Sequence, residues 1–277
     1  MDKNMSAVCK ICNGDTKLLF TGTVMGKYVV KYFQCNNCSF IQTEEPYWLK
    51  EAYNSVISDL DIGIIYRNIQ LSNIVENIYY KGIFNSDNDF LDYGGGYGMF
   101  ARMMRDKGFR FYRHDPYCDN LFAKYFDITD LPANQRFEVL TAFEVFEHLV
   151  NPKEELEKML KFSDNIIFST ELQPAGNITP ETWWYFVPES GQHISLYSIG
   201  ALQALAKSFG LHLYTNRSSI HIFSRKELSV DPFVSDPPIT RFQKVIRRFK
   251  GQKVPLRKES LLSKDFDYIK GILKERK

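Results

Sequence analysis

The sequence predicts an α/β protein, in which a mainly parallel sheet is covered by helices and preceded by a small cysteine-rich module. Two observations indicate the sheet. A short apolar run at 90–93 leads through a glycine-rich turn into a helical pattern that ends near Gly108. Further strand and helix patterns then alternate as far as residue 224, which is typical of doubly wound sheets. The third observation is that four of the five cysteines lie within the first forty residues.

Each expected element has a local signal. Apolar residues recur at helical spacing before the first strand, Ser198 is a candidate N-cap, and Gly108 and Gly210 follow helical patterns as C-terminal caps. The last two apolar runs are separated by a short polar turn and predict a hairpin. We expect helices at 66–84, 99–107 and 198–209, and seven strands at 90–93, 109–116, just before 128, 137–143, 165–169, 211–215 and 220–224.

The turn after the first strand of the sheet is the strongest candidate for a ligand site. Asp92 ends the strand, and Gly94, Gly96 and Gly98 follow at alternate positions. Glycine is needed where the backbone takes a positive φ or where a ligand touches the main chain, and nucleotide-like ligands bind at such turns. The dinucleotide fingerprint would place its third glycine at position 99, which is Met99. This disfavours an NAD-dependent enzyme, and an ordinary turn remains the alternative.

Two more acids stand near the ends of expected strands. Asp115 ends the second strand about 20 residues beyond the glycine turn, where a carboxylate suits a ribose diol. A capping role before Pro116 is the alternative. Asp127 stands where the third strand should end, and its carboxylate either accepts from an adenine amino group or stabilises a turn.

The N-terminal cysteines form two C-x2-C pairs, a spacing that predicts a zinc-ribbon-like module with four thiolate ligands. Four protein ligands fill the tetrahedron, so this Zn2+ is expected to be structural. Two disulfides are the alternative. The N-terminus has no apolar segment of a signal peptide, so we expect a cytoplasmic protein with reduced thiols. The four predicted metal ligands are Cys9, Cys12, Cys35 and Cys38.

Composition limits the partners. The net charge of +2 implies no broad polyelectrolyte partner, so no nucleic acid is expected. No run of about 18 apolar residues predicts a membrane span. Basic and apolar residues alternate at 241–250 as in an amphipathic helix, which either packs on the sheet or contacts an anionic acceptor or membrane surface. We expect a zinc-binding module at 1–45, a helical connector at 46–85, the main domain at 86–230 and a basic extension at 231–277.

Two motifs carry a family resemblance. The D-x-G-x-G-x-G run at 92–98 resembles motif I of class I S-adenosylmethionine-dependent methyltransferases, and E-x-x-E-H-x-x-x-P at 144–152 is similar to their post-strand motifs. The resemblance implies a Rossmann-like seven-stranded sheet with helices on both faces. It also implies S-adenosylmethionine as the cofactor, lying over Gly94, Gly96 and Gly98. Asp92 could then hold the ammonium group of the cofactor, directly or through water.

The whole pattern looks most like the sugar C-methyltransferases of deoxysugar pathways, which carry a zinc domain, a glycine motif and a catalytic histidine after the fifth strand. His193 matches that histidine in its place after the expected fifth strand. Those enzymes have a large further domain after the matching region, where about fifty residues follow here. The resemblance implies O- or C-methylation of a small-molecule or sugar-type acceptor, in surface polysaccharide or secondary metabolism.

Three residues are the catalytic candidates. His193 is expected to be the general base, because the unperturbed pKa of histidine suits proton transfer near neutral pH. Glu144 and His148 are expected beside it as supporting polar groups, and His148 is the competing base. The alternative is that both histidines only bond the backbone. The alternative for the chain as a whole is a zinc-ribbon binding protein on an inactive Rossmann-like scaffold.

Overall fold

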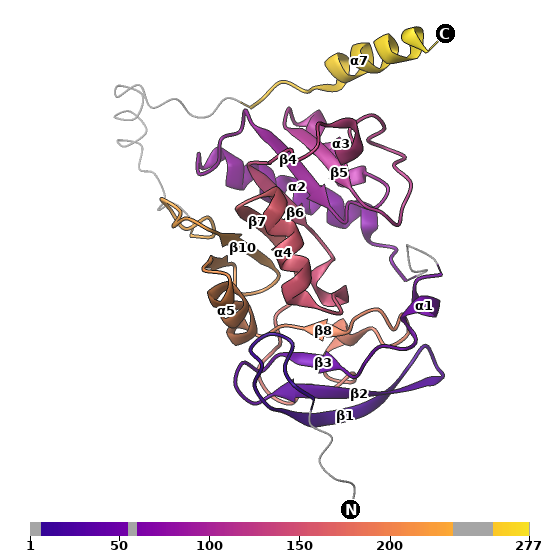
Figure 1. The fold of residues 1–277 in the computed structure, drawn as a ribbon, viewed down its shortest axis with the longest axis vertical. Helices are drawn as coiled ribbons and strands as arrows, with labels where there is room; N and C mark the ends of the chain where they lie inside the picture. The colour runs from indigo at the N-terminus through magenta and orange to yellow at the C-terminus, as the bar shows by residue number, and fades with distance from the viewer. Residues whose placement is uncertain (1–6, 55–59, 235–256, 277) are drawn as a thin grey trace, which may run out of the picture.

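The computed structural model describes residues 7–54, 60–234 and 257–276, which build two sheets with helices packed around the larger one (Figure 1). The predicted amphipathic helix at 241–250 lies outside the described residues. Within the described ranges, no helix is both long and apolar enough to cross a membrane.

The central sheet has six strands in the order β5-β4-β6-β7-β10-β9. The first four strands in this order are parallel, and β10 runs antiparallel to both of its neighbours. This confirms the expected α/β class and the terminal hairpin. The strands are β4 (Asp89–Tyr93), β5 (Arg110–His114), β6 (Val139–Ala142), β7 (Asn165–Ser169), β9 (His212–Thr215) and β10 (Ile220–Ser224).

Helices cover both faces of this sheet. Neighbouring strand residues point to opposite faces, so Phe90 and Leu91 belong to different apolar clusters. The Phe90 side packs against α2 (Ile64–Tyr80) and α3 (Met99–Asp106), and the Leu91 side packs against α4 (Pro152–Phe162) and α5 (Ile199–Ser208).

The prediction of seven strands is wrong by one among the described residues. The segment that ends at Asp127 makes only an isolated bridge with Arg113. The chain then turns into the short 3-10 helix η1 (Ile128–Asp130). The Asp127 side chain accepts a hydrogen bond from the backbone of Asp130, and the Asp130 side chain accepts one from the backbone of Asp127. This reciprocal capping favours a turn over continued pairing at the sheet edge.

The smaller sheet contains β1 (Thr16–Val24), β2 (Tyr28–Cys35), β3 (Ile41–Thr43) and β8 (Ser195–Leu196), in that order. In Figure 1 the orange β8 therefore lies beside β3, at the edge of the sheet that the N-terminal strands form. Ile41 pairs with Leu196 and Gln42 with Ser195. A strand from late in the chain thus completes the sheet that carries the cysteines.

The connector binds the same late segment. It contains the single-turn helix α1 (Leu49–Ala52) and the start of α2. Trp48 is buried, and its indole Nε1 donates to the backbone oxygen of Gly191 at 2.7 Å. Gln192 in turn donates from Nε2 to the oxygen of Ala52 at 2.7 Å. These bonds hold residues 191 and 192, which lie just before His193 and β8, against the connector.

The C-terminal helix α7 (Leu262–Glu275) is held to α3 by a buried ion pair. Asp265 accepts two bonds from Arg105 of α3, at 2.8 Å from Nε and 2.6 Å from Nη2, and one from Arg102 at 2.8 Å. The side chains of Arg105 and Asp265 are only 5% and 6% exposed. Loss of one partner would leave a buried charge uncompensated.

We therefore predict that Asp265→Ala lowers the free energy of unfolding by about 3 kcal/mol, measured by urea denaturation. Asp267→Ala, at an exposed position of the same helix, is the matched control and should change it by less than about 0.5 kcal/mol. Equal stabilities of the two variants would show that the ion pair does not hold α7.

Candidate functional site

A cavity of about 1760 Å³ opens at the carboxyl ends of the parallel strands. The loops after β4, β5, β6 and β7 all contribute to its wall, and so does the segment before β8. This is the edge of an open α/β sheet at which ligands bind. The predicted site residues that line it are Asp92, Gly94, Gly96, Asp115, Glu144, His148 and His193.

The glycine turn needs its glycines. Gly94, Gly96 and Gly98 have φ of +69°, +52° and +85°, in the left-handed region that favours glycine. A Cβ on Gly94 would lie 2.7 Å from Val145 Cγ2, whereas a Cβ on Gly96 would meet no atom within 4 Å. The space above Gly96 is therefore open, and its backbone can touch a bound molecule.

Asp92 is buried and only half satisfied. It is 2% exposed, and Oδ1 accepts from Thr141 Oγ1 at 3.0 Å. Oδ2 has no hydrogen-bond partner among the described residues. Burial raises the pKa of Asp92 to about 7. A buried oxygen without a donor is costly, so this carboxylate suits a cationic group in the cavity.

Asp115 and Asp127 have different surroundings. Asp115 accepts from the backbone N–H of Gly96 at 2.9 Å and of Tyr117 at 2.8 Å. This places the carboxylate beside the glycine turn on the cavity wall. Asp127 instead pairs with the buried Arg113, with Nη1 to Oδ2 at 2.7 Å, and it is not among the cavity-lining residues. The turn role of Asp127 is therefore the one that the geometry favours.

The two histidines come together from distant parts of the chain. His148 ends the 3-10 helix η2 (Phe146–His148) after β6, and His193 stands two residues before β8. Their ring centroids are 5.0 Å apart. His148 Nδ1 lies 3.0 Å from the backbone oxygen of Gln192, and His193 Nδ1 lies 2.5 Å from that of Tyr185. Burial lowers the pKa of both rings, that of His193 to about 3.

Glu144 and Glu147 behave differently. Glu144 Oε1 accepts from Ser169 Oγ at 2.7 Å, and Oε2 lies 3.4 Å from Arg67 Nε. Glu147 is fully buried, and neither of its carboxylate oxygens has a hydrogen-bond partner in the described chain. Burial, followed by the charge of Glu144, raises the pKa of Glu147. Glu147 belongs to the motif at 144–152, but the sequence pattern predicted no role for it.

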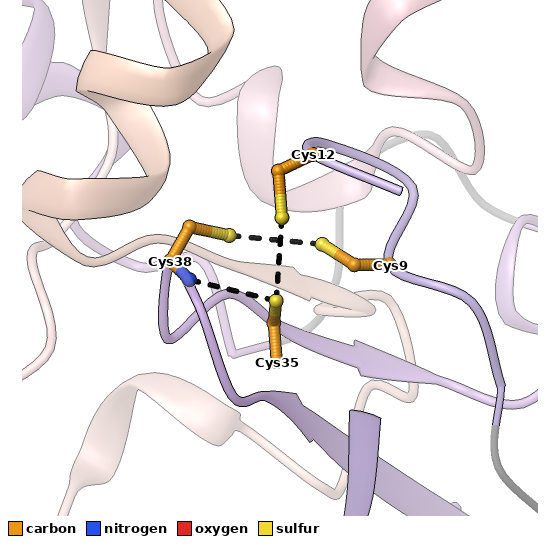
Figure 2. Close-up of side chains that lie close together, drawn as sticks. All are labelled: Cys9, Cys12, Cys35 and Cys38. Carbon is orange, nitrogen blue, oxygen red and sulfur yellow. Dashed lines mark hydrogen bonds between the residues drawn. The ribbon is translucent and has the colours of Figure 1, made fainter. Parts of the chain in front are cut away.

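The four N-terminal cysteines point toward a common centre (Figure 2). The Sγ atoms of Cys9 and Cys38 are 3.6 Å apart, and those of Cys12 and Cys35 are 3.4 Å apart. These separations are far longer than a disulfide of about 2.05 Å, and all four thiols are free. All four Sγ atoms lie within 4.8 Å of one another. The cluster could hold a metal ion.

Comparisons with solved structures give only distant likenesses. The chain is 14% identical to the methyltransferase CalO1 of calicheamicin biosynthesis, over 61% of this chain and 59% of that one, with a TM-score of 0.40. It is 12% identical to the plantazolicin methyltransferase BpumL, over 65% of this chain and 93% of that one, with a TM-score of 0.45. It is 14% identical to an O-methyltransferase family protein from Burkholderia thailandensis, over 65% of this chain and 68% of that one, with a TM-score of 0.44. The match spans less than two thirds of CalO1, and at these TM-scores none of the likenesses identifies an acceptor.

The sequence itself gives the stronger result. No curated protein matches it. A family model described as a methyltransferase domain, however, matches residues 70–216, which is more than half of the 277-residue chain. The matched range includes the glycine turn, His148, His193 and five of the six strands of the central sheet, and β10 lies beyond it. The chain therefore belongs to the methyltransferase-domain family.

Proposed function

We propose that the protein transfers a methyl group from S-adenosylmethionine to an oxygen or carbon atom of a small-molecule or sugar-type acceptor. The observation that carries the proposal is that one cavity is lined both by Asp92, whose Oδ2 has no partner among the described residues, and by Gly96, above which the space is open. The ammonium group of the cofactor would bind the Asp92 carboxylate, and its bulky nucleoside would fill the space above Gly96. Membership of the methyltransferase-domain family supports the same assignment.

The residues of the glycine turn fit this cofactor in three ways. Asp92 would hold the ammonium group through a charge-assisted hydrogen bond. The left-handed turn would let the main chain at Gly96 approach the cofactor without a side chain between them. Asp115 is held at the same turn by the N–H groups of Gly96 and Tyr117, and its remaining lone pairs would accept from the ribose hydroxyls.

The acceptor would lie at the other end of the cavity, against His148 and His193. The bound cofactor supplies an electrophilic methyl group on a sulfonium centre, and much of the catalysis is to hold the acceptor atom about 3 Å from that carbon. The proposal keeps His193 as a residue that contacts the acceptor. A proton acceptor works best with a pKa near the working pH, so the lowered pKa of His193 makes the free imidazole a weak base.

The N-terminal cysteines are proposed to hold a structural Zn2+. Four thiolates fit a closed tetrahedral site, and the 4.8 Å limit on their separations is close to that geometry. The metal would join the segment before β1, which carries Cys9 and Cys12, to the end of β2 and the loop that follows it, which carry Cys35 and Cys38. Through β3 and β8 it would also fix the chain next to His193.

The first test concerns the open space above Gly96. Gly96→Val should reduce the affinity for S-adenosylhomocysteine at least tenfold in calorimetry, because the new side chain would occupy the volume of the ligand. Gly176→Val is the matched control, since Gly176 also has a positive φ, of +102°, with no atom near its Cβ position, but does not line the cavity. Equal losses in the two variants would mean that backbone strain, and not ligand volume, causes the effect.

The second test concerns the charge of Asp92. An ammonium group binds the ionised carboxylate, so the affinity for S-adenosylhomocysteine should fall as the pH drops through about 7, the pKa to which burial raises Asp92. Asp92→Asn should bind at least about tenfold more weakly, as expected for a lost bond to a charged group, and without this pH dependence. A wild-type affinity that stays constant through that range would place the ammonium group elsewhere.

The third test concerns the zinc. Cys12→Ser combined with Cys35→Ser should remove one tightly bound zinc equivalent, measured by elemental analysis, and should lower the melting temperature, because metal binding stabilises so small a module. Cys118→Ser is the control, since Cys118 lies outside the cysteine cluster, and it should keep the metal. A double variant with the zinc content of the wild-type protein would refute the site.

A further inference from the structure

A second group of potential ligands lies at the acceptor end of the cavity. Glu147 and His148 are adjacent in η2, and His193 reaches them from the segment before β8. The backbone N–H of Ile194 donates to the backbone oxygen of Glu147 at 2.9 Å and holds the two segments together. One ligand atom from each of the three side chains lies within 4.8 Å of the others.

The hydrogen bonds of the two imidazoles fix which nitrogen is available. A backbone oxygen can only accept, so the Nδ1 of His148 donates to Gln192 and the Nδ1 of His193 donates to Tyr185. The proton of each neutral ring is therefore on Nδ1, and Nε2 carries a lone pair. Histidines that bind metals are oriented in this way, by a bond from the second nitrogen to a backbone oxygen or carboxylate.

Glu147 brings a buried carboxyl group to this cluster. It is fully buried, and both of its oxygens lack a hydrogen-bond partner within the described residues. Arg67 lines the same cavity but pairs with Asp61 at 2.8 Å and with Glu144 at 3.4 Å. A buried carboxyl group without a donor is rare in native proteins and calls for a physical explanation. A cation at this point would provide one.

We propose that Glu147, His148 and His193 form a binding site for a divalent metal ion, for which Zn2+ fits the ligand set best. Two imidazole nitrogens and one carboxylate oxygen are the three protein ligands found in one class of catalytic zinc sites. At bond lengths near 2.1 Å, two ligands of one ion lie at most about 4.2 Å apart. The 4.8 Å within which one ligand atom of each side chain lies is close to this limit.

This site would differ from the cysteine cluster in having an open position. Three protein ligands leave the fourth place of the tetrahedron for another molecule. Both histidines line the cavity while Glu147 lies behind them, so the open position would face the acceptor. The site thus selects an acceptor with an oxygen donor, such as a hydroxyl group.

The role of the ion rests on the proposed methyl transfer. An acceptor hydroxyl bound to the metal would have a lowered pKa and would lose its proton to solvent water. Its oxygen would then form a bond to the methyl carbon, while the carbon–sulfur bond breaks and leaves its electron pair on sulfur. His193 would act as a metal ligand in this scheme, which removes the need for a strongly basic imidazole.

Cobalt titration tests the site without any acceptor. The full chain, with zinc retained at the cysteines, is dialysed against a mild chelator and titrated with Co2+ alone. We expect one equivalent of Co2+ with visible d–d bands and without sulfur-to-cobalt charge transfer, since the ligands are nitrogen and oxygen. Glu147→Gln and His193→Ala should lose this equivalent. His212→Ala, which removes an exposed histidine outside the cavity, should keep it.

Circular dichroism and zinc content show whether each variant is folded, and His193→Ala alone decides the question if Glu147→Gln does not fold. Absence of the bands in the wild-type protein, or their persistence in folded His193→Ala, would overturn the proposal. Calorimetry with S-adenosylhomocysteine on the same samples separates the two proposals. Cofactor binding without cobalt binding would refute only the metal site, and cobalt binding without cofactor binding would refute only the methyltransferase function.

Discussion

The pairing of β3 with β8 is the constraint on which the acceptor side of the molecule depends. Only two residue pairs form this ladder, yet they attach the segment that carries His193 to the sheet that carries the cysteines. Trp48 and Gln192 add side-chain bonds between the connector and the same segment. The N-terminal module therefore supports one segment of the cavity wall from behind, without lining the cavity itself. The proposed structural zinc would act at a distance on the position of His193.

The part of the cavity proposed to bind the cofactor depends instead on local backbone geometry. The left-handed turn after β4 leaves open space above Gly96, and the N–H of that glycine holds Asp115 in place. Asp92 is kept half satisfied by Thr141. Within the described residues, Asp92 on the cavity wall has one oxygen without a donor, and Glu147, buried beside the cavity-lining His148, has two. The proposed cationic partners, an ammonium group for Asp92 and a metal ion for Glu147, would account for them.

Features encoded by short sequence patterns could be predicted, and features made by distant segments could not. The glycine spacing predicted a turn whose left-handed φ values the structure confirms, and the two C-x2-C pairs predicted a cluster of free thiols. The strand β8 has only two residues, too few to show an alternating pattern, and its partner β3 lies about 150 residues earlier in the chain. A local sequence pattern therefore could not predict it. The burial of Glu147 depends on that same packing, so its sequence context gave no sign of it. The missing strand near Asp127 shows capping chemistry prevailing over an expected pairing.

The central claim is that the cavity binds S-adenosylmethionine, and thermal unfolding with competing ligands tests it most directly. A ligand that binds only the folded protein raises the melting temperature by mass action. S-adenosylmethionine and S-adenosylhomocysteine should each raise it, with a shift that grows with ligand concentration, and NAD should not. Stabilisation by NAD alone would contradict the account and indicate a dinucleotide enzyme. No shift with any of the three ligands would indicate a binding protein on an inactive scaffold.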